Sequence, residues 1–230
     1  MKLILHAVPA TIAGRLQRMG VPYTAWSAGS EAGASPNGAS SGSVVCLSAC
    51  PAELHLAPDT LLVDLSPTPT PSDAPLRVTV VFQDSGFAVE HGFLLAAGGP
   101  ADLVERAVPL LDTLAPTPGA WLYAGGQEAP YFMQQVLAEF GGSWQVFAAR
   151  MMAYHHSHGL SLIWQEQQAL AERLQTLAQR YIDTANERDY RPFRRLPLFP
   201  AISFPGMQPN ASPASNLAHY LCWFTRQRAE

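Results

Sequence analysis

The segment His91-Gly-Phe-Leu-Leu-Ala-Ala-Gly-Gly99, followed by Ala101–Leu114, shows the clearest succession of strand and helix in this sequence. Phe93–Ala97 is a short apolar run that ends at two glycines, which is typical of a buried strand. The next segment carries an apolar stripe at helical spacing, made of Leu103, Ala107, Leu110, Leu111 and Leu114. Trp121–Ala124 is again a short apolar run. This order of strand, helix and strand predicts an α/β domain.

The sequence before this segment extends the same alternation. Ala10–Met19 has apolar residues at helical spacing and is followed by Gly20, which predicts a helix. Ala28–Ser43 is dense in Gly, Ser, Ala and Pro and predicts a loop. Five apolar runs predict strands: Leu3–Val8, Tyr23–Ser27, Val44–Ser48, Leu61–Leu65 and Val78–Phe82.

The sequence after residue 126 predicts helices alone. Ala129–His158 has a helical pattern with an expected break at Gly141-Gly142, and Leu160–Ile182 has an apolar stripe at helical spacing. Ser212-Pro213 predicts an N-cap and first residue of a final helix. We therefore predict a Rossmann-like, doubly wound and mostly parallel sheet in residues 1–126, and an all-helical domain in residues 127–230.

Composition and charge narrow the possible functions. A net charge of -4 argues against a nucleic-acid binder, which would carry a basic stripe. No apolar run approaches the ~20 residues that cross a membrane, so we expect no membrane span. Three cysteines form no even disulfide framework, which favours a reducing compartment and a cytoplasmic protein.

Several strings, taken in their order along the chain, resemble the β-hydroxyacid dehydrogenase family, which includes 6-phosphogluconate and 3-hydroxyisobutyrate dehydrogenases. Leu61-Leu-Val-Asp-Leu-Ser66 resembles a recurrent strand phrase of that family. His91–Gly99 resembles its "G-x-L-x-x-x-x-G-G" string, and Val108-Pro-Leu-Leu111 its "V-x-P-L-L". Gly125-Gly-Gln-Glu-Ala129 resembles the turn into its long interdomain helix. The resemblance covers roughly residues 1 to 150 and implies a Rossmann-like NAD(P)-binding domain.

The cofactor site that this resemblance implies is degenerate in the present sequence. A dinucleotide needs a glycine-rich turn after the first strand, where the backbone and the helix N-terminus meet the pyrophosphate. The corresponding string His6-Ala-Val-Pro-Ala10 has no glycine, and Pro9 lacks an N–H donor. Ser27 follows the second strand where the family places a ribose- or phosphate-binding residue. Together with Ser27, six residues are predicted to line the degenerate cleft: His6, Ala7, Val8, Pro9, Ser48 and Ser66.

The catalytic positions that the resemblance implies are also changed. Pro130 stands where the family has its proton-donating Lys, and Gln134 stands where it has an Asn. Tyr131 is adjacent and is the candidate replacement donor, although a core or interface aromatic explains it as well. The substrate loop keeps Ser85-Gly86, which a tight turn also explains.

His155 and His158 are at positions i and i+3 and could share a metal ion on a helix. No acidic residue within that segment completes a ligand set, so we predict no metal site, with these two histidines as the candidates.

Two functions remain in view. In the first, the chain is a pseudoenzyme: it needs no cofactor, lacks hydride transfer and acts as a binding or assembly module that dimerises through its C-terminal helices. In the second, it is an NAD(P)-dependent reductase with an atypical phosphate loop and Tyr131 or His91 as the proton donor.

Overall fold

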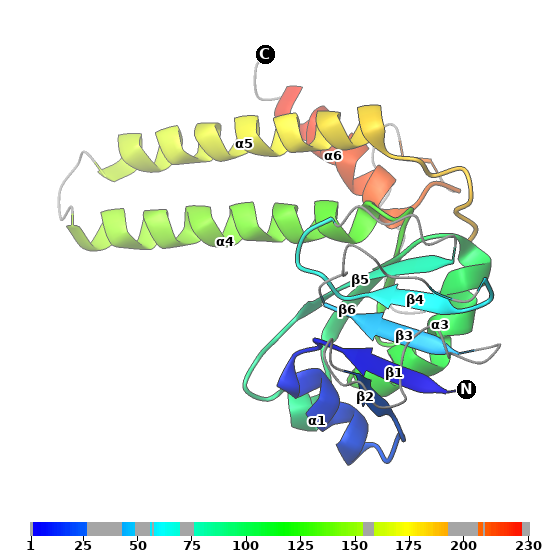
Figure 1. Ribbon diagram of the computed structural model, residues 1–230. Helices are drawn as coiled ribbons and strands as arrows, with labels where there is room; N and C mark the ends of the chain where they lie inside the picture. The colour runs from blue at the N-terminus through cyan, green and yellow to red at the C-terminus, as the bar shows by residue number, and fades with distance from the viewer. Residues whose placement is uncertain are drawn as a thin grey trace. The chain divides into compact units, whose positions relative to one another are not determined.

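The computed structural model describes residues 2–26, 43–48, 56, 58–69, 76–153, 159–192, 207–208 and 210–226 (Figure 1). The chain forms two compact units, one of Met1–Tyr131 with Asn186–Phe193 and one of Phe132–Ala185 with Arg194–Glu230. The predicted boundary between residues 126 and 127 stays a prediction. In the part that is described, no helix is long and apolar enough to cross a membrane.

The first unit contains a seven-stranded sheet in the order β2-β1-β3-β4-β5-β6-β7. All neighbouring strands are parallel except β5 and β6, which are antiparallel. The strands are β1 (Leu3–His6), β2 (Thr24–Trp26), β3 (Val44–Leu47), β4 (Leu61–Asp64), β5 (Arg77–Gln83), β6 (Leu94–Gly98) and β7 (Leu122–Gly125). The predicted Rossmann-like, mostly parallel sheet followed by helices is confirmed.

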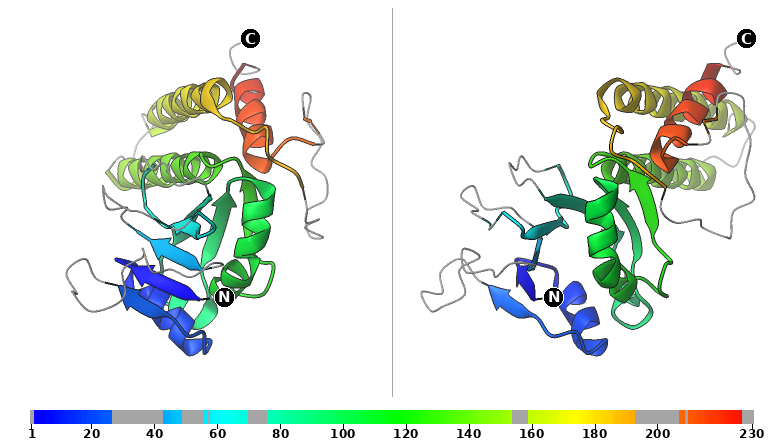
Figure 2. Two further views of the ribbon diagram at one scale, coloured as in Figure 1. Left: turned by 45° about the vertical axis from the view of Figure 1, so that its right-hand side comes forward. Right: turned by 90° about the vertical axis from the view of Figure 1, so that its right-hand side faces the viewer.

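Three helices of this unit pack on one face of the sheet: α1 (Ala10–Arg18), α2 (Ala88–His91) and α3 (Ala101–Leu114). Figure 2 shows α1 and α3 on the same side of the strands. The α3 stripe predicted from the sequence is fully buried there, together with Phe93 and Leu16. The opposite face of the sheet buries a smaller cluster of Ile4, Val45, Leu47 and Leu62.

The segment after residue 185 returns to the first unit and packs on β7 and α3. The Tyr190 ring lies 4.9 Å from the Tyr123 ring, and the Ala101 N–H donates to the Asp189 carbonyl at 3.4 Å. A Cβ at Gly126 would collide with the Asn186 carbonyl, so the second glycine of Gly125-Gly126 permits this contact. The packing of this segment on the first unit was not predicted from the sequence.

The helix α4 (Ala129–Ala153) begins in the last residues of the first unit and continues into the second. The second unit also contains α5 (Gly159–Thr184) and α6 (Pro213–Arg226). The predicted break at Gly141-Gly142 is wrong, because α4 continues through both glycines. Glycine costs a helix only about 1 kcal/mol, and packing of neighbouring residues such as Val136 and Ser143, both buried, offsets it. The Ser212 N-cap is confirmed: its Oγ accepts a hydrogen bond from the Ser215 N–H at 3.0 Å.

Candidate functional site

The strand order places a topological switch point between β1 and β3. The chain runs outward from β1 to β2 on one side and from β3 through β7 on the other. In open α/β sheets, ligands bind outside the carboxyl ends of the strands at such a point. At this edge His6 ends β1, Ser48 follows β3 and Asp84 follows β5, so these residues form the rim of the candidate site.

The turn from β1 to α1 has a geometry that suits a dinucleotide poorly. Ala7 has φ +50°, in the left-handed region that glycine favours, and its side chain is exposed. Pro9 precedes α1 as its N-cap and has no N–H to offer a phosphate. Val8 is half-buried against the core. The backbone at position 7 thus has the positive φ that glycine favours, although the residue is alanine and carries a Cβ.

A carboxylate stands at the start of α1. The Thr11 hydroxyl donates a hydrogen bond to Asp84 Oδ2 at 2.9 Å, and Asp84 follows directly after β5. Thr11 is the second residue of α1, where the positive end of the helix dipole attracts anions. Asp84 therefore places negative charge beside the first turn of α1. Asp84 was not predicted as a site residue, although it lies two residues after the predicted strand Val78–Phe82.

The residues of this turn differ in three ways from those of a dinucleotide-binding turn. Ala7 has a positive φ where glycine is usual, Pro9 lacks an N–H donor, and the carboxylate of Asp84 lies beside Thr11. Ser27 lies outside the described residues, so the ribose contact has no structural account.

Ser48 and Ser66 follow β3 and β4 at the same edge. The hydroxyl oxygens of both are buried and have no hydrogen-bond partner in the described part of the chain. The Ser66 N–H donates to Asp64 Oδ1 at 2.9 Å. Hydroxyls without partners at the carboxyl edge are compatible with a polar ligand.

A buried ion pair lies beside these serines. Arg77 at the start of β5 pairs with Asp64 at the end of β4, and the two side chains are 9% and 2% exposed. A charge inside an apolar strand requires a partner, so Asp64 in Leu61-Leu-Val-Asp was the sequence signal for this pair. The sequence analysis overlooked it.

Tyr131, the candidate proton donor, is 4% exposed, and its hydroxyl donates to the Thr68 carbonyl at 3.2 Å. Burial, together with the negative charge of Asp64, raises the pKa of Tyr131 to about 12. General acids work best with a pKa near the operating pH, so this hydroxyl is poorly matched to proton donation near neutrality. Its adjacent residue, Pro130, is buried, and a Cβ at Gly98 would collide with its ring.

The other predicted site residues are exposed or half-buried. Ser85 and Gly86 are exposed in the turn before α2, where the Ser85 carbonyl accepts from the Ala88 N–H at 2.9 Å. His91 is exposed, and Gln134 on α4 is half-buried in the second unit.

The candidate metal ligands His155 and His158 lie outside the described residues. Among the residues that are described, no three His, Cys, Asp or Glu side chains form a group that could hold a metal ion.

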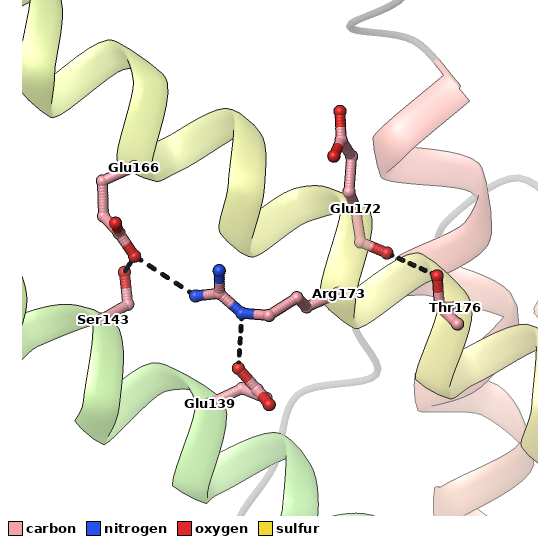
Figure 3. A network of polar contacts seen from close by, with 6 residues as sticks. All are labelled: Glu139, Ser143, Glu166, Glu172, Arg173 and Thr176. Atoms are coloured by element: carbon pink, nitrogen blue, oxygen red, sulfur yellow. Dashed lines mark hydrogen bonds and ion pairs between the residues drawn. The ribbon is translucent and has the colours of Figure 1, made fainter.

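The second unit holds a polar groove of about 480 Å³ between α4 and α5, which the sequence analysis did not anticipate. Arg173 of α5 donates to Glu139 of α4 at 2.7 Å and to Glu166 at 3.2 Å (Figure 3). The Ser143 hydroxyl also donates to Glu166 at 3.2 Å. The hydrogen bonds that Arg173 donates to Glu139 and Glu166 raise the pKa of Arg173 above its usual value. The charges at the centre of the groove therefore satisfy one another and serve to join the two helices.

The fold described above is similar to those of solved structures. No family model and no curated protein matches the sequence. An imine reductase from Bacillus cereus BAG3X2 matches with a TM-score of 0.50 and 14% identity, over 83% of this chain and 78% of that one.

Two further solved structures are similar. The Mycobacterium tuberculosis 3-hydroxyisobutyrate dehydrogenase matches with a TM-score of 0.49 and 16% identity, over 80% of this chain and 71% of that one. The Plasmodium falciparum 6-phosphogluconate dehydrogenase matches with a TM-score of 0.46 and 10% identity, over 76% and 48%. The expected fold, a Rossmann-like sheet followed by a helical C-terminal part, is confirmed, and it is similar to that of the Bacillus cereus imine reductase.

Proposed function

We propose that this chain is a non-catalytic relative of the β-hydroxyacid dehydrogenases that acts as a binding or assembly module. It keeps the scaffold of an oxidoreductase and has lost nicotinamide-cofactor binding and hydride transfer.

The hydrogen bond between Thr11 and Asp84 carries this proposal. A dinucleotide places its pyrophosphate at the N-terminus of the first helix, where the dipole and free N–H groups stabilise negative charge. Here the carboxylate of Asp84 lies 2.9 Å from the Thr11 hydroxyl at that position. A bound pyrophosphate would be repelled by Asp84, and the turn offers no glycine to compensate.

The surroundings of the family's proton donor support the same proposal. Pro130 has no proton to give, and the buried Tyr131 hydroxyl is occupied by the Thr68 carbonyl. The residues at these two positions therefore supply packing in place of acid catalysis.

Assembly is the role that the second unit supports. Its α4 exposes several large apolar side chains, among them Leu137 and Trp144. Exposed apolar area of this kind marks interaction surfaces. We expect the chain to form a homodimer through these helices.

The proposal is tested by titrating the purified chain with NAD, NADH, NADP and NADPH, with thermal unfolding and calorimetry as readouts. A ligand at 100 times its Kd stabilises a folded protein by about 2.7 kcal/mol, so micromolar binding would raise the unfolding temperature clearly at millimolar ligand. We expect no shift and no binding heat. An active imine reductase, treated in the same way, serves as the positive control.

Asp84→Asn and Tyr131→Phe test the two possible functions. Asp84→Asn removes the charge at the start of α1 and leaves Ala7 and Pro9 in place, so we expect it also to bind no cofactor. Micromolar binding of any of the four cofactors to the unaltered chain would instead favour the NAD(P)-dependent reductase. In that case Tyr131→Phe should abolish turnover while leaving cofactor affinity unchanged.

A further inference from the structure

A short loop that carries two prolines follows β4 in the first unit. This β4 loop (residues 66–69) reads Ser66-Pro-Thr-Pro69, so two of its four residues have no N–H to donate. Ser66 is buried, whereas the three residues after it are exposed. Within the part of the chain that the structure describes, no backbone–backbone hydrogen bond involves residues 66–69. The hydrogen bonds that hold this loop to the described residues therefore come from side chains.

Two buried side chains of the first unit bind the β4 loop at different points. At its start, Asp64 Oδ1 accepts a hydrogen bond from the Ser66 N–H at 2.9 Å. Two residues further on, the Thr68 carbonyl accepts a hydrogen bond from the Tyr131 hydroxyl at 3.2 Å. The side chain of Asp64 is 2% exposed and Tyr131 is 4% exposed. The loop is thus held from the end of β4 and from the first turn of α4.

The groups beside the β4 loop are polar and costly to bury. Asp64 pairs with Arg77, and Thr79 lies next to Asp64 in the register of β4 and β5. The hydroxyl oxygens of Ser66 and Thr79 are buried and have no hydrogen-bond partner among the described residues. Water would solvate these hydroxyls and the ion pair, so their burial opposes closure of the loop. Closure therefore depends on the two hydrogen bonds from Asp64 and Tyr131, and loss of one of them favours opening.

Tyr131 is the side chain that can release the loop without breaking the ion pair. Asp64 holds both Ser66 and Arg77, so its loss would leave a buried guanidinium unpaired. Burial raises the pKa of the Tyr131 hydroxyl, with Asp64 raising it further and Arg77 lowering it. The hydroxyl is therefore protonated near neutral pH and available as a donor to the Thr68 carbonyl.

We propose that the β4 loop is a gate over the Asp64–Arg77 pair, and that the Tyr131 hydroxyl holds this gate shut through the Thr68 carbonyl. With the gate open, solvent reaches the ion pair and the two buried hydroxyls beside it. The gate thus controls access to polar groups at the carboxyl edge of β4, next to the candidate site. This inference rests on the proposed binding role only for the use of the gate, since the gate itself is a property of the first unit.

The test is hydrogen exchange of the full chain, followed for single amides by NMR. The Ser66 N–H reports opening of the gate, because it exchanges when its bond to Asp64 opens, and the Leu111 N–H in the buried stripe of α3 reports unfolding of the unit. Tyr131→Phe keeps the ring, removes the donor and leaves the sequence neighbours of Ser66 unchanged. We expect Ser66 to exchange about fivefold faster relative to Leu111, which corresponds to the loss of one hydrogen bond.

Two variants serve as controls. Thr68→Ala removes the side chain but keeps the carbonyl that Tyr131 uses, so the ratio of the two exchange rates should stay unchanged. Tyr123→Phe removes another buried hydroxyl, which donates to the Gly99 carbonyl at 2.8 Å, and should change both rates by the same factor.

An unchanged ratio in Tyr131→Phe, or an equal change of the ratio in Tyr123→Phe, would overturn the proposed gate. The cofactor titration does not depend on either amide. A failure of the gate therefore leaves the proposed loss of cofactor binding intact, and the reverse also holds.

Discussion

At the scale of the residue, Ala7 has an unusual backbone conformation in the turn from β1 to α1. The backbone keeps φ +50°, which costs a residue with a Cβ about 1 kcal/mol relative to glycine. The bend is therefore imposed by the connection from β1 to α1. In dinucleotide-binding turns, glycine at such a bend lets the backbone approach a phosphate.

Substitution of Ala7 tests this strain directly. We expect Ala7→Gly to leave the free energy of unfolding unchanged or to raise it by up to about 1 kcal/mol, because relief of strain offsets the greater freedom of glycine in the unfolded chain. The measurement is urea unfolding. Ala10→Gly, at the exposed first residue of α1, is the control and should lower stability by about 0.5 kcal/mol. Equal losses in both variants would show that the turn stores no strain.

At the scale of the element, the helices of the first unit are joined by one buried guanidinium. Arg15 of α1 is 5% exposed and donates to the carbonyls of Glu90, Thr113 and Ala115 at 2.8, 3.1 and 3.0 Å. These carbonyls lie at the C-terminal ends of α2 and α3, where a cation is favoured by the helix dipoles. One side chain thus satisfies two helix ends.

Arg15→Ala should lower the free energy of unfolding by about 3 kcal/mol, because it leaves buried carbonyls without donors and opens a cavity. Arg15→Lys should recover part of this loss, since an ammonium lacks the planar fork of a guanidinium. Arg18→Ala is the control on the same helix: its ion pair with Glu90 spans 3.9 Å at the surface and contributes under ~0.5 kcal/mol. A loss at Arg15 no larger than at Arg18 would contradict this role.

Elements also differ in how far the sequence could predict them. The strand β3 and the helix α3 were predictable, because a continuous apolar run and a helical stripe report burial directly. The continuity of α4 through Gly141-Gly142 was not, because tertiary packing outweighs a small local cost. The four-residue α2 and the antiparallel pairing of β5 with β6 depend on partners distant in sequence.

At the scale of the whole molecule, the candidate site also has features that the sequence could predict and features that it could not. Two features could be predicted from single sequence positions. The turn after β1 lacks the glycine that a dinucleotide-binding turn requires, and proline at position 130 cannot act as a proton donor. The Thr11–Asp84 bond joins residues separated by 73 positions, and the Asp64–Arg77 pair depends on strand register, so neither follows from local pattern. Charged contacts between elements were the part of the site that required three-dimensional structure.

The distribution of buried acids predicts how the whole molecule responds to alkaline pH. Burial raises the pKa of the Cys46 thiol from 9.0 to about 12, that of Tyr131 from 10.0 to about 12, and that of Tyr123 above its usual value. A group whose pKa is raised on folding is neutral in the native state, so its contribution is complete below the unfolded pKa. It is lost as pH rises toward the folded pKa, because only the unfolded chain then releases the proton.

We therefore expect the free energy of unfolding to be flat up to about pH 9 and then to fall, by up to about 1.4 kcal/mol per pH unit for each group, more steeply above pH 10 where the tyrosines join. Urea unfolding between pH 7 and 11 measures this curve. Cys46→Ala loses some stability at neutral pH through its cavity but should show a shallower fall between pH 9 and 10. Its fall above pH 10 should also stay shallower than that of the original chain, since the native Cys46 thiol keeps its proton up to about pH 12 while the unfolded one has lost it. Parallel curves for the two proteins between pH 9 and 10 would mean that the Cys46 thiol ionises as readily in the core as in the unfolded chain, which its 1% exposure argues against.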